Sequence, residues 1–219
     1  MNLGGISMAV TAIIPAYNEE KTIGDVLKVV CNMSLIDQVI VVSDGSWDNT
    51  ANIAKKHGAK VIELKENIGK GGAVKVGVKE CDSDIVLLLD ADLIGLKDEH
   101  IFNLLTPVIN QEADMTVGIF KHGRIITDIA QKIAPHLSGQ RALRRYIIEE
   151  LEDLDITRYG IEVSLTVHVN RKSYRTLEVY LEDITHLTKE EKLGIISGFS
   201  SRLKMYMDII KVLSKTLMH

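Results

Sequence analysis

Five consecutive aliphatic residues, Ile85–Leu89, lie directly before the sequence Asp90-Ala91-Asp92. Such a short apolar run is typical of a strand that is buried on both faces in the middle of a parallel sheet. Residues i and i+2 of an extended chain point to the same side, so Asp90 and Asp92 can face one spot at the carboxyl end of this strand. Two carboxylates that lie so close together favour a cation between them. Mg²⁺ or Mn²⁺, shared with a substrate phosphate, is the natural candidate. The alternative is a solvated loop with two unrelated acids, and Asp-x-Asp alone does not decide between them.

Strands and helices alternate along the first 120 residues. The apolar patterns predict strands over 10–14, 38–43, 60–64, 85–89 and 114–120, with Pro15 ending the first of them. They predict helices over 19–33, 50–57, 72–81 and 98–110. This alternation indicates βαβ units, and therefore an α/β fold with a mostly parallel, Rossmann-like sheet and helices on both faces. Ligands of such sheets bind at the carboxyl ends of the strands.

The loops at those ends carry side chains that suit a nucleotide. They are the segments 15–20 (P-A-Y-N-E-E), 44–50 (D-G-S-W-D-N-T), 66–72 (E-N-I-G-K-G-G) and 90–92 (D-A-D). Asp44 can accept a hydrogen bond from the ring N–H of a uracil-like base. Lys70 offers a positive charge to phosphates, and its glycine neighbours let the backbone come close to a ligand. Helix caps at Asn49 and Thr50, and a flexible connection over 67–72, are the alternatives.

Composition excludes several classes of protein. The chain has 219 residues and a formal net charge of −4, which gives no reason to expect nucleic-acid binding. Cys31 and Cys81 lack metal-ligand spacing, so we expect core residues of a reducing compartment. No apolar run approaches the roughly 20 residues of a membrane span, and residues 1–8 do not resemble a signal peptide. A cytoplasmic protein is the expectation.

Four motifs together resemble the nucleotide-binding half of family 2 glycosyltransferases, which have the GT-A fold. The motifs are I-I-P-A-Y-N-E-E, V-V-S-D-G-S-W-D-N-T, N-I-G-K-G-G-A and L-L-L-D-A-D-L. The set resembles in particular the relatives that include glucosyl-3-phosphoglycerate synthase and the polyprenyl-phosphate sugar transferases. The resemblance implies one GT-A catalytic domain over 1–187, with a nucleotide-sugar-binding half at 9–125 and an acceptor-binding half at 126–187.

The resemblance also implies roles for individual residues. The nucleotide-sugar-binding residues would be Pro15, Tyr17, Glu19, Asp44, Lys70, Asp90 and Ala91. Asp92 would bind a catalytic divalent metal, Mg²⁺ or Mn²⁺. The pair Ser43-Asp44 departs from the commoner Asp-Asp or Asn-Asp, and this departure bears on the choice of base.

The second half should supply the acceptor site. We expect a helix over 124–133, a loop over 135–141 and a helix over 142–155, with Ser138 and Gly139 at the start of the latter, where they would suit an anion. By the resemblance, Gly139, Gln140 and Arg141 would bind the acceptor. Surface arginines on an amphipathic helix are the alternative for 144 and 145.

Glu162 follows Tyr159-Gly160-Ile161 at the start of an apolar-rich segment. It matches a Y-G-x-E position that lies beside the acceptor hydroxyl in related transferases. There a carboxylate would act as general base in an inverting enzyme, or would position the sugar in a retaining one. An acid favoured by the helix dipole is the alternative. A strand is expected over 175–184, after which His186 would complete the metal shell together with Asp92.

Residues 188–219 predict one long amphipathic helix. The apolar residues recur with 3-4 spacing, at Ile196, Phe199, Leu203, Tyr206, Ile210, Leu213 and Leu217. Such a helix packs on the domain, pairs in a homodimer, or makes peripheral contact with an anionic membrane, which would be the inner membrane face.

These observations favour a metal-dependent glycosyltransferase that moves a sugar from a UDP- or GDP-linked donor to a small phosphorylated acceptor or a lipid phosphate. Two alternatives stay open. One is a catalytically silent nucleotide-sugar-binding subunit. The other is a sugar-phosphate nucleotidyltransferase, although its glycine- and arginine-rich first loop is replaced here by 15–20. A dinucleotide-binding enzyme is disfavoured, because no G-x-G-x-x-G follows the first strand.

Overall fold

The computed structural model describes residues 8–121, 138–151 and 160–186. Within them the main sheet has the strand order β3-β2-β1-β4-β7-β6-β8. Its strands are β1 (Val10–Ala16), β2 (Gln38–Ser43), β3 (Lys60–Glu63), β4 (Ile85–Leu88), β6 (Met115–Lys121), β7 (Arg141–Arg144) and β8 (Thr176–Glu182). All neighbouring strands are parallel except β7, which is antiparallel to both β4 and β6. A second, two-stranded sheet pairs β5 (Leu93–Ile94) with β9 (Thr185–His186).

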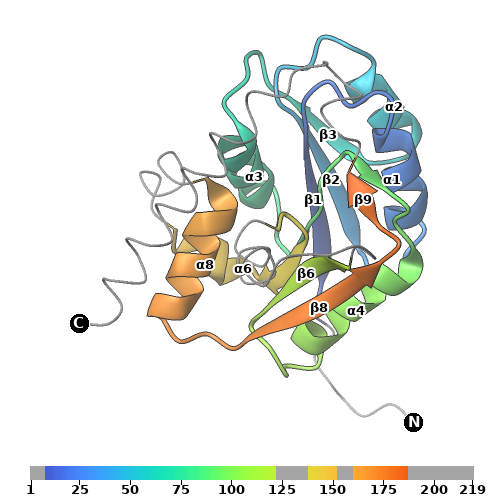
Figure 1. Ribbon diagram of the computed structural model, residues 1–219. Coiled ribbons are helices and arrows are strands. Elements are labelled where there is room, and N and C mark those ends of the chain that lie inside the picture. The colour runs from blue at the N-terminus through green and yellow to red at the C-terminus, as the bar shows by residue number, and fades with distance from the viewer. Residues whose placement is uncertain (1–7, 122–137, 152–159, 187–219) are drawn as a thin grey trace, which may run out of the picture.

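Helices cover both faces of the main sheet (Figure 1). They are α1 (Ile23–Val30), α2 (Thr50–Lys56), α3 (Lys70–Lys79), α4 (Asp98–Ile109), α6 (Arg145–Glu149) and α8 (Ile161–Arg171). Buried side chains of α1 and α4 belong to one core cluster, and those of α3, α6 and α8 to the other. The mostly parallel α/β architecture expected from the sequence is confirmed.

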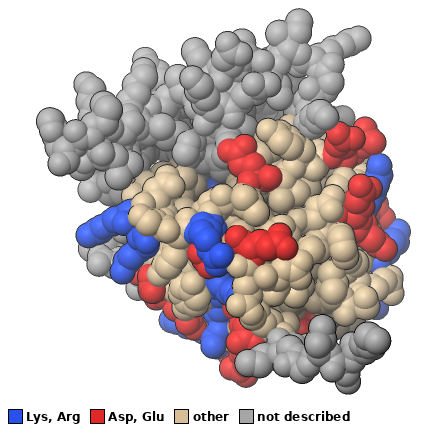
Figure 2. Space-filling view, turned by 90° about the horizontal axis from the view of Figure 1, so that it is seen from below, with Lys and Arg blue, Asp and Glu red and all other residues tan. Residues whose placement is uncertain are grey.

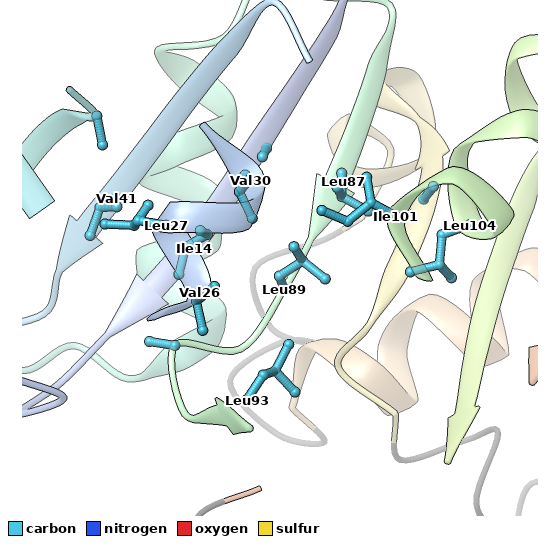
Figure 3. Close-up of a cluster of buried hydrophobic side chains, with 14 of the residues drawn as sticks. Ile14, Val26, Leu27, Val30, Val41, Leu87, Leu89, Leu93, Ile101 and Leu104 are labelled. Carbon is cyan, nitrogen blue, oxygen red and sulfur yellow. The ribbon is translucent and has the colours of Figure 1, made fainter. Parts of the chain in front are cut away.

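The central strand β4 contributes to both clusters, as its apolar run predicts. Ile85, Leu87 and Leu89 belong to the cluster with α1 and α4, which Figure 3 shows in close-up. Val86 and Leu88 belong to the opposite cluster. All five are at most 4% exposed. The two aspartates that follow are therefore held at the end of one of the most deeply buried strands.

The helix expected over 142–155 is wrong at its start. Residues 141–144 form strand β7, and within the described part of that range, up to residue 151, the helix spans Arg145–Glu149. The segment lies between β4 and β6. Its Ala142 is in register with Leu87 of β4 on one side and with Thr116 of β6 on the other. Pairing with two neighbours satisfies its backbone on both sides, which outweighs a local preference for helix. Ser138 and Gly139 consequently do not stand at a helix start.

Two smaller expectations also need correction. Pro15 does not end β1, which continues to Ala16 with Pro15 in register with Val42. The pairing of β1 with β4 stops at Ile13, so at Pro15 only one neighbouring strand remains and a missing N–H costs little. Cys31 is exposed and lies at the end of the short helix α1, whereas Cys81 is buried as expected.

Several expectations fall outside the described residues. They concern the helix over 124–133, the loop over 135–137, the end of the helix over 142–155, and the C-terminal helix over 188–219.

Within the described ranges, no helix combines the length and the apolar character needed to cross a bilayer. On the face of the molecule in Figure 2, basic and acidic side chains lie next to one another and between uncharged residues.

Gly77 lies where α3 packs most closely on the sheet. An ideal Cβ at this position would lie 2.6 Å from Ile13 Cγ2 and 3.3 Å from Val42 Cγ2. Both neighbours are fully buried and β-branched, so they cannot move aside easily. The close approach of α3 depends on the missing side chain.

We predict that Gly77→Ala destabilises the protein by about 1–2 kcal/mol, because overpacking outweighs the gain in helix propensity. Gly24→Ala in α1 is the matched control, since its Cβ would meet only ordinary contacts at 3.5 Å. It should leave stability unchanged or raise it slightly. Urea unfolding followed by circular dichroism measures both. Equal effects of the two substitutions would contradict the packing argument.

Candidate active site

The loops that follow β1 and β2 are held together by hydrogen bonds. The Asp44 N–H donates to the Ala16 carbonyl over 2.8 Å, and the Trp47 N–H donates to Asn18 Oδ1 over 3.0 Å. The Glu19 N–H donates to Thr50 Oγ1 over 2.8 Å. The motifs P-A-Y-N-E-E and D-G-S-W-D-N-T therefore lie side by side at the carboxyl ends of their strands.

Two aromatic side chains of these loops face solvent. Tyr17 is 47% exposed, and Trp47, the single tryptophan of the chain, is 81% exposed. Neither contributes to a hydrophobic core cluster. The two aromatic side chains at this edge of the sheet are therefore not needed to fill the core.

Asp44 connects the end of β2 to the glycine-rich loop. Its side chain is buried, and its two oxygens accept hydrogen bonds from the N–H groups of Ile68 at 2.8 Å and Gly69 at 3.0 Å. Gly45 adopts φ +70°, and a Cβ there would lie 2.7 Å from the Asn67 nitrogen. A role of Asp44 in base recognition, expected from the sequence, stays a prediction. The structure adds that this carboxylate fixes the loop that leads to Lys70.

Lys70 is the first residue of α3 and bridges two carboxylates. Its Nζ lies 2.5 Å from Asp90 Oδ1 and 2.5 Å from Glu162 Oε1. The side chain of Lys70 is 37% exposed, while those of Asp90 and Glu162 are 18% and 19% exposed. Burial disfavours the charged ammonium, but the two carboxylates outweigh burial and hold the pKa of Lys70 well above its usual range. Three segments far apart in sequence meet at this ammonium group.

The segment before β7 packs directly on the Lys70–Asp90 pair. Gln140 Nε2 donates to Asp90 Oδ2 over 2.9 Å. A Cβ at Gly139 would lie 2.5 Å from Lys70 Nζ and 2.6 Å from Asp90 Oδ2, so any side chain there would collide with the ion pair. The residues predicted for the acceptor are thus in contact with residues predicted for the donor.

Arg141 is fully buried at the start of β7. Its Nε donates to the Ser138 carbonyl over 2.9 Å, and its Nη2 donates to Thr166 Oγ1 on α8 over 3.1 Å. Burial lowers the pKa of the guanidinium to about 10, while the negative charge of Glu162 opposes this shift. Arg141 is therefore a buried cation at neutral pH. Sequence reasoning missed Thr166, although its position four residues after Glu162 places both on one face of a helix.

A small cavity connects these groups. Its lining residues are Pro15, Lys70, Val74, Leu88, Leu89, Gly139, Arg141, Ile161, Glu162 and Leu165. Five of them were predicted site residues, and the aliphatic ones come from α3, α8 and the end of β4. Tyr17, Glu19 and Asp44 do not line this cavity and lie on the neighbouring loops.

Ala91 and Asp92 follow at the end of β4, with Ala91 buried and Asp92 half-buried. The backbone of His186 is brought to this point, because Leu93 pairs with His186 in the two-stranded sheet. The side chain of His186 lies outside the described residues. Among the residues that are described, no three His, Cys, Asp or Glu side chains are grouped to hold a metal ion. The ligand pair Asp92 and His186 stays a prediction.

Two relatives cover different shares of the chain. An uncharacterized protein of Methanocaldococcus jannaschii is 27% identical over 227 residues, which cover 90% of this chain and 91% of the relative. Dolichyl-phosphate beta-glucosyltransferase of Drosophila melanogaster is 41% identical over 102 residues, which cover 39% of this chain and 31% of the relative. The chain thus matches the archaeal protein over nearly its whole length and the fly enzyme over less than a third of that enzyme.

The solved structures include a match to glucosyl-3-phosphoglycerate synthase from Mycobacterium tuberculosis in complex with Mn²⁺, uridine-diphosphate and phosphoglyceric acid. The TM-score is 0.73 at 24% identity, with 85% of this chain and 74% of that chain covered. The described sheet and helices agree with that likeness, and the GT-A fold expected from the sequence is confirmed. The model of the family described as glycosyl transferase family 2 matches residues 11–162, more than half of the chain. With β2, β4, nearly all of β1 and the start of α8 inside that match, the chain belongs to glycosyl transferase family 2.

Proposed function

We propose that the protein is a metal-dependent glycosyltransferase that moves a sugar from a UDP- or GDP-linked donor to a small phosphorylated acceptor or a lipid phosphate. The observation that carries the proposal is the meeting of Lys70, Asp90 and Glu162 within ion-pair distance at the ligand-binding edge of the sheet. Donor and acceptor groups would share this edge. The first 187 residues would form one catalytic domain around it.

The donor would lie along the loops after β1 and β2. Tyr17 and Glu19 border this edge together with Asp44, and they would hold the nucleoside. Each carboxylate oxygen of Asp44 has a second lone pair beyond the backbone N–H that it already accepts, so it can also accept a base N–H. The Lys70 ammonium would contact the diphosphate, with Asp90 and Ala91 beside the ribose.

Asp92 and His186 would hold a divalent cation, Mg²⁺ or Mn²⁺. A carboxylate and an imidazole suit either ion, and the pairing of Leu93 with His186 brings the two residues to the same turn. The Mycobacterium tuberculosis synthase structures with Mn²⁺ and UDP, or Mg²⁺ and UDP, support this choice of ion. A bound cation stabilises negative charge on a departing diphosphate as a Lewis acid.

The acceptor would lie against Gly139, Gln140 and Arg141. A phosphorylated acceptor finds a buried cation in Arg141, and Glu162 lies across the same cavity. In an inverting reaction the Glu162 carboxylate takes the proton of the acceptor hydroxyl as that oxygen attacks the anomeric carbon. In a retaining reaction Glu162 positions the sugar instead. Peripheral membrane contact or dimerisation through residues 188–219 belongs to the same proposal, with a lipid-phosphate acceptor favouring the former.

We predict micromolar, metal-dependent binding of UDP or GDP that is lost in Asp92→Ala. The measurement is isothermal titration of each nucleotide with and without Mn²⁺. The matched control is Asp82→Ala, which removes an exposed carboxylate at the opposite, amino end of β4 and should change nothing. If neither nucleotide binds in the presence of Mn²⁺, the proposed function is wrong.

We predict that Glu162→Gln lowers the turnover number at least about a hundredfold, because the general base or sugar-positioning carboxylate is lost. Binding of the donor nucleotide should change much less. Release of UDP or GDP from the donor is followed in two arms, one with phosphoglyceric acid and one with dolichyl phosphate in detergent. Full activity of Glu162→Gln with either acceptor would remove Glu162 from the mechanism.

A further inference from the structure

The Lys70 ammonium lies between two carboxylates and supplies the positive charge that they share. It lies at 2.5 Å from an oxygen of Asp90 and at 2.5 Å from an oxygen of Glu162. Both acids are about four-fifths buried. Two largely buried carboxylates facing each other require a counter-charge, and in the described structure the protein supplies it from its own chain.

The surroundings hold this arrangement in place. Gly139 leaves the space in which Lys70 Nζ and the Asp90 carboxylate meet. Gln140 binds the second oxygen of Asp90, so the carboxylate has a partner on each side. Neighbouring residues therefore hold the Lys70–Asp90 pair in place, which distinguishes it from an isolated ion pair on the surface.

We propose that Lys70 is the resident counter-ion of the ligand-free site and that it weakens binding of a free divalent cation until a donor diphosphate draws the ammonium away from Glu162. The displacing ligand and the metal position at Asp92 both rest on the proposed function. The two ion pairs of Lys70 rest on the geometry. Asp90 is two residues from Asp92, so the charge on Lys70 lowers the negative potential at the metal position as well.

Under this proposal, loss of the ammonium changes the affinities for Mn²⁺ and for the nucleotide in opposite directions. The side chains of Lys70, Asp90 and Glu162 together carry one negative charge, and loss of the ammonium leaves two. A variant without the ammonium should attract Mn²⁺ more strongly. The same variant should bind UDP or GDP more weakly, because a cation that contacts the diphosphate is gone. General damage to the site would weaken both.

The test is Mn²⁺ binding without nucleotide, measured by electron paramagnetic resonance of the free ion. We expect Lys70→Met to bind Mn²⁺ at least about fivefold more tightly than the wild type. Lys60→Met is the matched control, because Lys60 also pairs with a carboxylate, that of Glu80 at 2.8 Å, at the amino end of β3. It makes the same change in net charge and should leave Mn²⁺ affinity unchanged. Equal or weaker affinity in Lys70→Met than in the wild type overturns the proposal.

Further variants separate charge from folding. Lys70→Gln keeps hydrogen-bond donors and should show the same increase, so it replaces Lys70→Met if the latter does not fold. Lys70→Arg keeps the charge and should keep the weak affinity of the wild type. The double variant Lys70→Met/Glu162→Gln restores one net negative charge and should return toward wild-type affinity. An unchanged high affinity in the double variant contradicts the counter-ion role. Because these titrations contain no nucleotide, their failure is distinguishable from failure of nucleotide binding.

Discussion

The antiparallel pairing of β7 with β4 on one side and β6 on the other is the interaction on which the site depends. Without it, the segment Ser138–Arg141 would have no fixed relation to the end of β4. With it, Leu88 pairs with Arg141, and Gly139 and Gln140 are carried against Asp90. The sequence-distant halves of the chain are therefore joined by main-chain hydrogen bonds, and the side-chain contacts of the site follow from this register.

Charge compensation is the second constraint, and it differs between the two cations of the site. Arg141 is completely buried and is held by a carbonyl and a hydroxyl, with the negative charge of Glu162 close enough to favour its charged form. Lys70 has a partly exposed side chain and pairs directly with two carboxylates. The planar guanidinium suits a fixed position with several acceptors, whereas the flexible lysine can exchange partners. Arg141 therefore suits a role that requires a fixed position, and Lys70 suits a role in which it changes partners.

The sequence predicted those parts of this arrangement that depend on local interactions. The strand before Asp90 and the helical spacing of α4 depend on short-range patterns, and the structure agrees with them. The glycine-rich loop predicted over 66–72 ends earlier, because α3 begins at Lys70. The strand at 141–144 could not be read from its own residues, because Arg-Ala-Leu-Arg becomes a strand only through its two neighbours. The contacts of Lys70 with Glu162 and of Arg141 with Thr166 join residues by tertiary packing alone. Resemblance assigned several of these residues to one site, but no pattern of spacing could pair them.

The exposure of Trp47 determines what can be learned from the protein by optical spectroscopy. All indole emission comes from this one residue, which is already 81% exposed in the folded state. Unfolding of the core therefore changes its surroundings little, and its fluorescence is a poor probe of stability. Its backbone N–H is bound to Asn18, beside Tyr17, so the same emission reports on whatever covers this edge of the sheet. The chain carries a built-in chromophore for whatever covers the loops after β1 and β2, separate from the integrity of its fold.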